Sequence, residues 1–168
     1  SAPSSALVLG ARATASSALA ALGELGITSS TVAARRFGGP GSVVAAASRL
    51  GVTIEQVLWS DAEAVDRAAS SADLVISTLP ASAADPLVER LRVREGQILL
   101  DVVYSPRDTA LRRAFESAGG VVAEGTDMLV FQAGAQVQLM TGRSPDTGVM
   151  REALEEELER RSREGTAL

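Results

Sequence analysis

The fold is decided by one stretch near the start of the chain, Leu7-Val8-Leu9-Gly10-Ala11-Arg12-Ala13-Thr14-Ala15. A short apolar run that ends at a glycine is typical of a buried parallel strand. Residues 13–25 then follow a helical period that ends at Gly26, a common helix stop. The chain therefore begins with a strand, a tight turn and a helix.

Strand and helix patterns alternate along the rest of the chain. Further strands are predicted at 30–34, 53–58, 74–76, 98–103 and 121–122. Further helices are predicted at 42–50, 61–70, 87–91, 109–118, 127–140 and 146–163. This order predicts an α/β fold, a Rossmann-like doubly wound parallel sheet of about six strands with helices on both faces. Ligands of such sheets bind at the carboxyl ends of the strands, near the point where the strand order reverses.

Length and charge narrow the class of protein. The chain has 168 residues and a net charge of -5. The length suits one domain, which we place at residues 6–163, and we interpret residues 1–5 as a leader or tag remnant. The negative charge argues against a nucleic-acid or acidic-membrane partner, and no apolar stretch has the roughly 18 residues of a membrane helix.

Three residue types are missing, and their absence excludes several chemistries. The chain has no Cys and no His, which excludes disulfides, thiol nucleophiles, the usual zinc sites and His-based triads. All 16 basic residues are Arg, so no lysine can serve as a general base, a P-loop cation or a Schiff base. We expect a cytoplasmic protein without a metal site.

The turn after the first strand departs from the dinucleotide fingerprint G-x-G-x-x-G/A at one position. Gly10 supplies the tight turn and Ala15 the small residue that lets helix and strand pack closely, but Arg12 stands at the third position. A glycine there lets the backbone approach a pyrophosphate without a Cβ in the way. Two outcomes follow for Arg12: its guanidinium folds outward and pairs with a phosphate, or the side chain closes the site.

The end of the second strand indicates which dinucleotide would bind. An acidic residue at this place binds the ribose 2′-hydroxyl of NAD, whereas an arginine accommodates the 2′-phosphate of NADP. Arg35 and Arg36 occupy it, so NADP is favoured over NAD if a dinucleotide binds. The alternative is that both are solvated loop arginines.

Three later segments together resemble the C-terminal half of the shikimate dehydrogenase family. Residues 76–80, Ile-Ser-Thr-Leu-Pro, are similar to the family's N-T-T-P turn. Residues 101–106, Asp-Val-Val-Tyr-Ser-Pro, with Thr109 and Leu111, resemble D-V-V-Y-N-P-x-x-T-x-L. Residues 125–133, Gly-Thr-Asp-Met-Leu-Val-Phe-Gln-Ala, resemble G-x-x-M-L-x-x-Q-A. Another Rossmann-type protein, such as a methyltransferase or a different dehydrogenase, is disfavoured by the last two segments.

The resemblance implies an NADP-binding domain and a role for each matching residue. It places a pyrophosphate on Gly10, Ala11, Arg12, Ala13 and Thr14, the 2′-phosphate on Arg35 with Arg36 beside it, and cofactor contacts on Thr78, Val102 and Gly125. It places substrate contacts on Tyr104 and Gln132. It implies no catalytic residue in this chain, because the family's Lys-Asp pair lies in an N-terminal substrate-binding domain.

Three of these side chains have a structural alternative. Tyr104 is also explained as an amphipathic residue at a strand end. Gln132 lies in an apolar stretch and needs a polar partner, which is either substrate or a backbone group. Asp101 is interpreted as a structural capping carboxylate rather than an acid/base group.

The leading hypothesis is that the chain is the cofactor-binding part of an enzyme that reduces 3-dehydroshikimate to shikimate with NADPH. We expect the chain to be inactive by itself. Quinate enzymes share these C-terminal features, so quinate is an alternative substrate. The alternative is a non-catalytic relative with a degraded nucleotide site, since Arg12, Ala13, Ala34, Ser77 and Leu79 all depart from the family pattern. In either case, we expect the helix over residues 127–140 to expose apolar side chains that contact a missing N-terminal domain, or that allow the isolated domain to form a homodimer.

Overall fold

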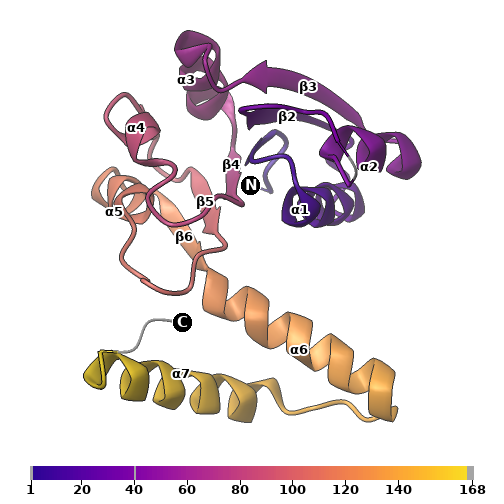
Figure 1. Ribbon diagram of the computed structural model, residues 1–168, viewed down its shortest axis with the longest axis vertical. Helices are drawn as coiled ribbons and strands as arrows, with labels where there is room; N and C mark the ends of the chain where they lie inside the picture. Colours follow the sequence, from indigo (N-terminus) through magenta and orange to yellow (C-terminus); the bar gives the residue numbers. More distant parts are fainter. Residues whose placement is uncertain (1, 40, 166–168) are drawn as a thin grey trace.

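The computed structural model describes residues 2–39 and 41–165, which form an α/β sheet domain with two helices beyond it (Figure 1). Its strands are β1 (Ala6–Leu9), β2 (Ser29–Ala34), β3 (Thr53–Leu58), β4 (Leu74–Ser77), β5 (Ile98–Asp101) and β6 (Val121–Glu124). Its helices are α1 (Ala13–Glu24), α2 (Val43–Leu50), α3 (Ala62–Ser71), α4 (Asp85–Val88), α5 (Ala110–Ser117), α6 (Gly125–Thr141) and α7 (Thr147–Arg163).

The six strands form one parallel sheet in the order β3-β2-β1-β4-β5-β6. The order reverses between β1 and β4, where Leu9 pairs with Ser77 on one side and with Ala33 on the other. This arrangement is the doubly wound order of nucleotide-binding sheets, and the sequence-based prediction of the fold is confirmed.

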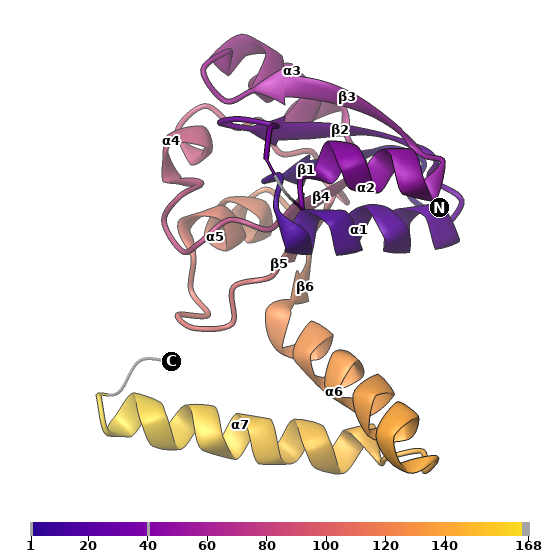
Figure 2. The ribbon, with the colours of Figure 1, turned by 45° about the vertical axis from the view of Figure 1, so that its right-hand side comes forward.

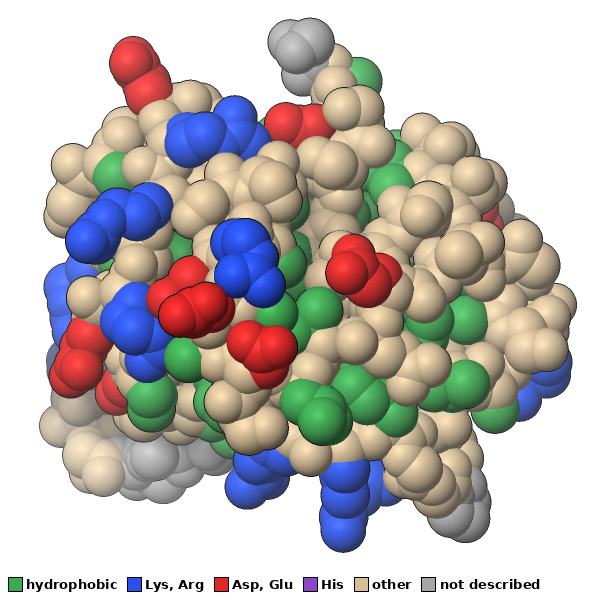
Figure 3. Space-filling view, turned by 90° about the horizontal axis from the view of Figure 1, so that it is seen from above, with side chains coloured by type: hydrophobic (Ala, Val, Ile, Leu, Met, Phe, Trp, Pro, Cys, Tyr) green, Lys and Arg blue, Asp and Glu red, His purple; other side chains and the backbone are tan. Residues whose placement is uncertain are grey.

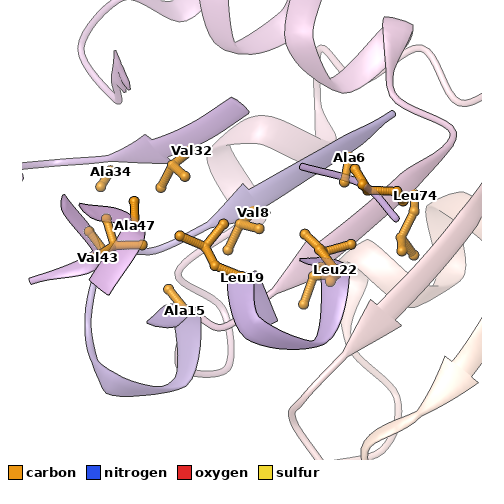
Figure 4. Close-up of a cluster of buried hydrophobic side chains, with 13 residues drawn as sticks. Ala6, Val8, Ala15, Leu19, Leu22, Val32, Ala34, Val43, Ala47 and Leu74 are labelled. Carbon is orange, nitrogen blue, oxygen red and sulfur yellow. The ribbon is translucent and has the colours of Figure 1, made fainter. Parts of the chain in front are cut away.

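Alternate residues of the central strands β1 and β4 enter different cores. Ala6 and Val8 face α1 and α2, where they pack on Leu19, Leu22 and Val43 (Figure 4). Leu7 and Leu9 face the other side, which α3, α4 and α5 cover with side chains that include Val65, Leu87, Leu111 and Phe115. The two cores explain why the sequence shows continuous apolar runs, since a strand covered on both faces has no polar side.

Four elements differ from the sequence-based prediction by two residues or more at one or both ends. β6 ends at Glu124 instead of residue 122, α6 begins at Gly125 instead of residue 127, and β5 and α4 also differ. β5 ends at Asp101 instead of Val103, because the Asp101 carboxylate accepts the Val103 N–H at 3.2 Å and removes it from the sheet ladder. α4 begins at Asp85 instead of Leu87, because Pro86 suits a first helical turn, where its missing N–H costs nothing.

The helical pair α6 and α7 lies beyond the sheet (Figure 2). α6 leaves the end of β6 and runs away from the other helices, and α7 packs back against it. The exposed fractions of Phe131, Leu139 and Met140 are 60%, 87% and 84%, so the expectation of exposed apolar side chains on this helix is confirmed. Within the described ranges, no helix has the length and apolarity needed to cross a membrane.

Ser4 and Ser5, inside the segment interpreted as a leader, are bound to the sheet. Asp73 accepts hydrogen bonds from the backbone and hydroxyl of Ser4 and from the Ser5 amide, and these bonds hold the pKa of its carboxyl well below the ordinary value. Hydrogen-bonded structure therefore begins two residues before β1, while Ser1 lies outside the described residues.

Candidate nucleotide site

Gly10 makes the turn after β1 and has no space for a side chain. Its φ is +110°, a left-handed conformation that favours glycine, and a Cβ built on it would lie 2.3 Å from Thr78 Oγ1. The Gly10 amide donates to Ala33 O at 2.8 Å, so the turn begins between β1 and β2. The expectation that Gly10 supplies the tight turn is confirmed.

Thr78 closes the same turn from the β4 side. Its amide and its hydroxyl both donate to Leu9 O, at 2.9 Å and 2.7 Å. The threonine hydroxyl thus occupies the space that the absent Gly10 side chain leaves. The two residues bring the ends of β1 and β4 together at the point where the strand order reverses.

A cavity of about 730 Å³ opens at this point. It is lined by Gly10, Ala11, Arg12, Ala34, Arg35, Arg36, Trp59, Thr78, Leu79, Pro80 and Ala83. Its volume lies within the range of small-molecule sites, roughly 300–1,000 Å³. Six of the ten residues assigned from the sequence to cofactor binding are therefore brought together here: Gly10, Ala11, Arg12, Arg35, Arg36 and Thr78. Ala13 and Thr14 follow in the first turn of α1 and do not line the cavity.

Trp59 lines the cavity and was not assigned from the sequence. It directly follows β3, and its amide donates to Ala34 O at 2.9 Å, which fixes it beside the end of β2. Its ring is half-buried against the core on the α3 side of the sheet. The signal available in the sequence was its place after a strand, because successive strands of a parallel sheet end at the same edge.

The cavity carries positive charge without a matching carboxylate. Arg12, Arg35 and Arg36 are exposed, and none of them has an ion pair with another described residue. On the left of the face shown in Figure 3, acidic and basic side chains lie next to one another, whereas the basic side chains at its lower edge have no acidic neighbour in this view. Unpaired guanidinium groups beside a helix amino terminus suit phosphate groups, so the donor set fits a dinucleotide. The described part of the chain contains no cluster of His, Cys, Asp or Glu that could hold a metal ion.

Val102 and Gly125 meet farther along the same edge of the sheet. Gly125 is buried at the start of α6, and a Cβ on it would lie 2.8 Å from Val102 O and 3.0 Å from Asp101 O. The Asp101 carboxylate also accepts the Thr109 hydroxyl at 2.8 Å, and Thr109 in turn caps α5. Asp101 therefore has the structural role expected from the sequence. Val102 and Gly125 lie outside the cavity lining.

Tyr104 and Gln132 also lie outside the cavity lining. Tyr104 is half-buried in the loop after β5. Gln132 is exposed on α6, so the argument that an apolar environment forces it to find a polar partner is wrong. Among its apolar neighbours in sequence, Val130 is buried and Phe131 is exposed, so the hydropathy of this stretch does not show which of its residues are covered.

An ion-pair network holds the loop that carries Tyr104. Arg107 pairs with Glu124 at the end of β6 and, at 2.7 Å, with Glu155 of α7. Arg112 of α5 also reaches Glu124, at 3.1 Å. The hydrogen bond from Arg107 is the largest cause that holds the pKa of Glu124 below its ordinary value, while partial burial opposes it. The network joins the loop after β5 to α5, β6 and α7.

The lowered pKa of Glu124 predicts a pH-dependent contribution to stability. This contribution is complete above the ordinary glutamate pKa of 4.5 and is lost as the pH falls through the lowered pKa of the folded state. We expect Glu124→Gln to reduce the free energy of unfolding at neutral pH by about 1 kcal/mol, and the difference from the parent chain to vanish in acid. Urea titrations across acidic pH would measure it. Glu156→Gln, which changes an exposed carboxylate with no ion pair among the described residues, is the matched control. A constant difference at every pH would contradict the assignment.

Comparisons with known proteins agree on one family. Residues 125–155 match the model of the Shikimate 5′-dehydrogenase C-terminal domain. The chain is 34% identical over 147 residues to a shikimate dehydrogenase (NADP(+)) of Oleidesulfovibrio alaskensis, an alignment that covers 82% of this chain and 48% of that protein. It is 37% identical to the crystal structure of Mycobacterium tuberculosis shikimate dehydrogenase, with a TM-score of 0.77 over 87% of this chain and 55% of the other.

A third similar protein is named for another substrate, and its structure holds another cofactor. Quinate dehydrogenase from Corynebacterium glutamicum, solved in complex with NAD, is 25% identical with a TM-score of 0.76, over 90% of this chain and 55% of the other. The chain thus spans about half the length of these relatives.

Proposed function

We propose that this chain, which is a C-terminal domain of the shikimate dehydrogenase family, binds NADP in the cavity at the carboxyl edge of its sheet. The observation that carries the proposal is the set of three unpaired arginines around a cavity at the reversal of the strand order. A dinucleotide brings phosphate groups to such a site, and guanidinium groups bind phosphate through paired hydrogen bonds.

The proposed placement follows the edge of the sheet from β2 to β6. The adenosine end lies beside Arg35 and Arg36, and the pyrophosphate lies on the backbone of residues 10–14 at the amino terminus of α1. The nicotinamide end lies near Val102 and Gly125. We favour NADP over NAD because the end of β2 carries arginines and no carboxylate.

In the longer protein, we propose that the activity is NADP-dependent reduction of 3-dehydroshikimate to shikimate. The bound cofactor supplies the hydride, and this chain binds and orients it. In this proposal, Tyr104 and Gln132 contact the substrate from the cofactor-binding domain. The chain has neither lysine nor histidine, so we expect the general base to come from a separate substrate-binding domain and this chain alone to be inactive.

The exposed apolar residues of α6 support a second domain at this place. Phe131, Leu139 and Met140 are large, apolar and solvent-exposed, and each gains by burial against another surface. A substrate-binding domain packed here would also lie beside Gln132. Without that domain, we expect the same residues to promote a homodimer, which sedimentation at increasing concentration would detect.

The proposal is tested by the response of the fluorescence of Trp59, the single tryptophan of the chain, to NADP and NAD. Because Trp59 lines the cavity, NADP bound there should change its emission in a saturable way. At about 100 times the dissociation constant, NADP should also add roughly 2.7 kcal/mol of stability against unfolding. If the folded chain responds to neither nucleotide, the alternative of a non-catalytic relative with a degraded site replaces the proposal.

Arg35 provides the variant for this test. Arg35→Ala should weaken NADP about tenfold, because one charge-assisted contact to the 2′-phosphate is lost, and should leave NAD nearly unchanged. Arg49→Ala is the matched control, since Arg49 is an exposed arginine at the other end of α2 with no ion pair among the described residues. Equal losses for NADP and NAD would show that Arg35 does not bind the 2′-phosphate.

A further inference from the structure

Arg12 stands where the fingerprint has a glycine, at the start of α1. It is the N-cap residue of α1, with φ -106° and ψ -164°, an extended conformation that any residue adopts. The substitution therefore introduces no backbone strain. Arg12 lies in the cavity lining, and the cavity remains open beside it.

The guanidinium of Arg12 reaches the loop between β2 and α2. Its Nη1 lies 3.9 Å from the position that a Cβ on Gly39 would take. Gly39 has no side chain and a φ of +106°, so this loop offers free space to the arginine. The loop leads into α2, whose first residue, Val43, donates from its amide to Ala11 O at 3.2 Å, directly before the N-cap of α1.

The same loop begins with the two arginines at the end of β2. Arg35 and Arg36 precede Gly39 by only a few residues, and all three arginines line one cavity. The Arg12 guanidinium is thus on the β2 side of the turn. The backbone amides at the amino terminus of α1, which suit a pyrophosphate, lie at the other end of its side chain.

We propose that Arg12 is a ligand of the 2′-phosphate of NADP, together with Arg35, and that it raises the preference for NADP over NAD. This inference rests on the proposed binding of NADP. Three arginines near one another repel, and a phosphate monoester with a charge of about -2 removes that repulsion. NAD carries a hydroxyl at this position and gains nothing from Arg12.

The test uses isothermal titration calorimetry to compare the dissociation constants of four ligands for the parent chain, Arg12→Ala and Arg12→Lys. The ligands are NADP, NAD, adenosine 2′,5′-bisphosphate and ADP, so that the 2′-phosphate and the pyrophosphate are examined separately. Arg12→Ala should weaken NADP and the 2′,5′-bisphosphate about tenfold and leave NAD and ADP unchanged. Arg12→Lys should lie between, because an ammonium keeps the charge and loses the planar fork.

Other outcomes overturn the inference and differ from a failure of the proposed function. If the parent chain binds none of the four ligands, the proposed function fails. If the parent binds NADP and Arg12→Ala weakens NAD and ADP equally, Arg12 binds the pyrophosphate. If Arg12→Ala changes nothing, or strengthens NADP and NAD together, Arg12 is a bystander or an obstruction. Unchanged thermal unfolding of both variants and of Arg49→Ala is the folding and charge control.

Discussion

An alanine at position 10 should abolish NADP binding and reduce the free energy of unfolding by about 3 kcal/mol. Two costs add in this variant. The left-handed backbone of Gly10 disfavours any side chain, and the new Cβ would lie 2.3 Å from Thr78 Oγ1. Because Thr78 is held to Leu9 O by two hydrogen bonds, it cannot move without opening the reversal point of the sheet. Urea denaturation and NADP titration measure the two effects.

Two further variants separate these costs. Gly26 also has a positive φ, of +83°, but nothing lies within 4 Å of a Cβ there, so Gly26→Ala should cost only about 1 kcal/mol and leave NADP binding intact. Thr78→Ala in the Gly10→Ala background removes the clashing oxygen and leaves the Thr78 Cβ position at an ordinary 3.6 Å. A coupling of about 1 kcal/mol or more is expected between the two sites. The explanation fails if Gly10→Ala costs no more than Gly26→Ala and shows no coupling.

Gly125→Ala should destabilise the chain by about 2 kcal/mol and weaken the binding of the nicotinamide end of NADP. Gly125 has no positive φ and lies in a helix, where alanine is intrinsically better than glycine. Its cost therefore comes from the contact of the new Cβ with Val102 O at 2.8 Å. This contact would push β5 and α6 apart at the place where we position the nicotinamide.

Gly134 in the same helix is the matched control. A Cβ on Gly134 would have its nearest contacts at 3.5 Å, with Pro145 and Thr147, which is ordinary packing. Gly134→Ala should therefore be neutral or stabilising by up to about 1 kcal/mol. Thermal unfolding of both variants measures the contrast. Equal effects at the two glycines would show that helix propensity, and not the approach to Val102, decides the result.

The part of the site that lies at the strand ends could be predicted from the sequence. Gly10, Arg35 and Thr78 each follow a strand, and the carboxyl ends of parallel strands meet at one edge, so their convergence could be predicted from element order alone. The sequence could not show whether Arg12 leaves the site open or closes it, because that depends on the direction of its side chain. The structure places the Arg12 guanidinium beside Gly39, in the loop between β2 and α2.

Gln132 marks what the sequence could not determine, and Trp59 marks a signal in the sequence that was overlooked. The apolar residues around Gln132 indicate burial, but burial requires a covering element. Val130 is covered, whereas Phe131 and Gln132 are exposed in the described structure. Trp59 belongs to no motif, but it directly follows β3, so the order of the elements places it at the same edge as the other strand ends. The exposure of Gln132 depends on tertiary contacts between segments far apart in the sequence.

The central claim, that the carboxyl edge of this sheet binds NADP, is tested most directly by following backbone amide resonances of the 17.3 kDa chain during an NADP titration. The expected result is a saturable set of shifts at residues 10–14, Arg35 and Arg36, Thr78, and Val102 with Gly125, with no change along α7. No shifts at high NADP in a folded chain, or shifts confined to surfaces away from this edge, would contradict the claim.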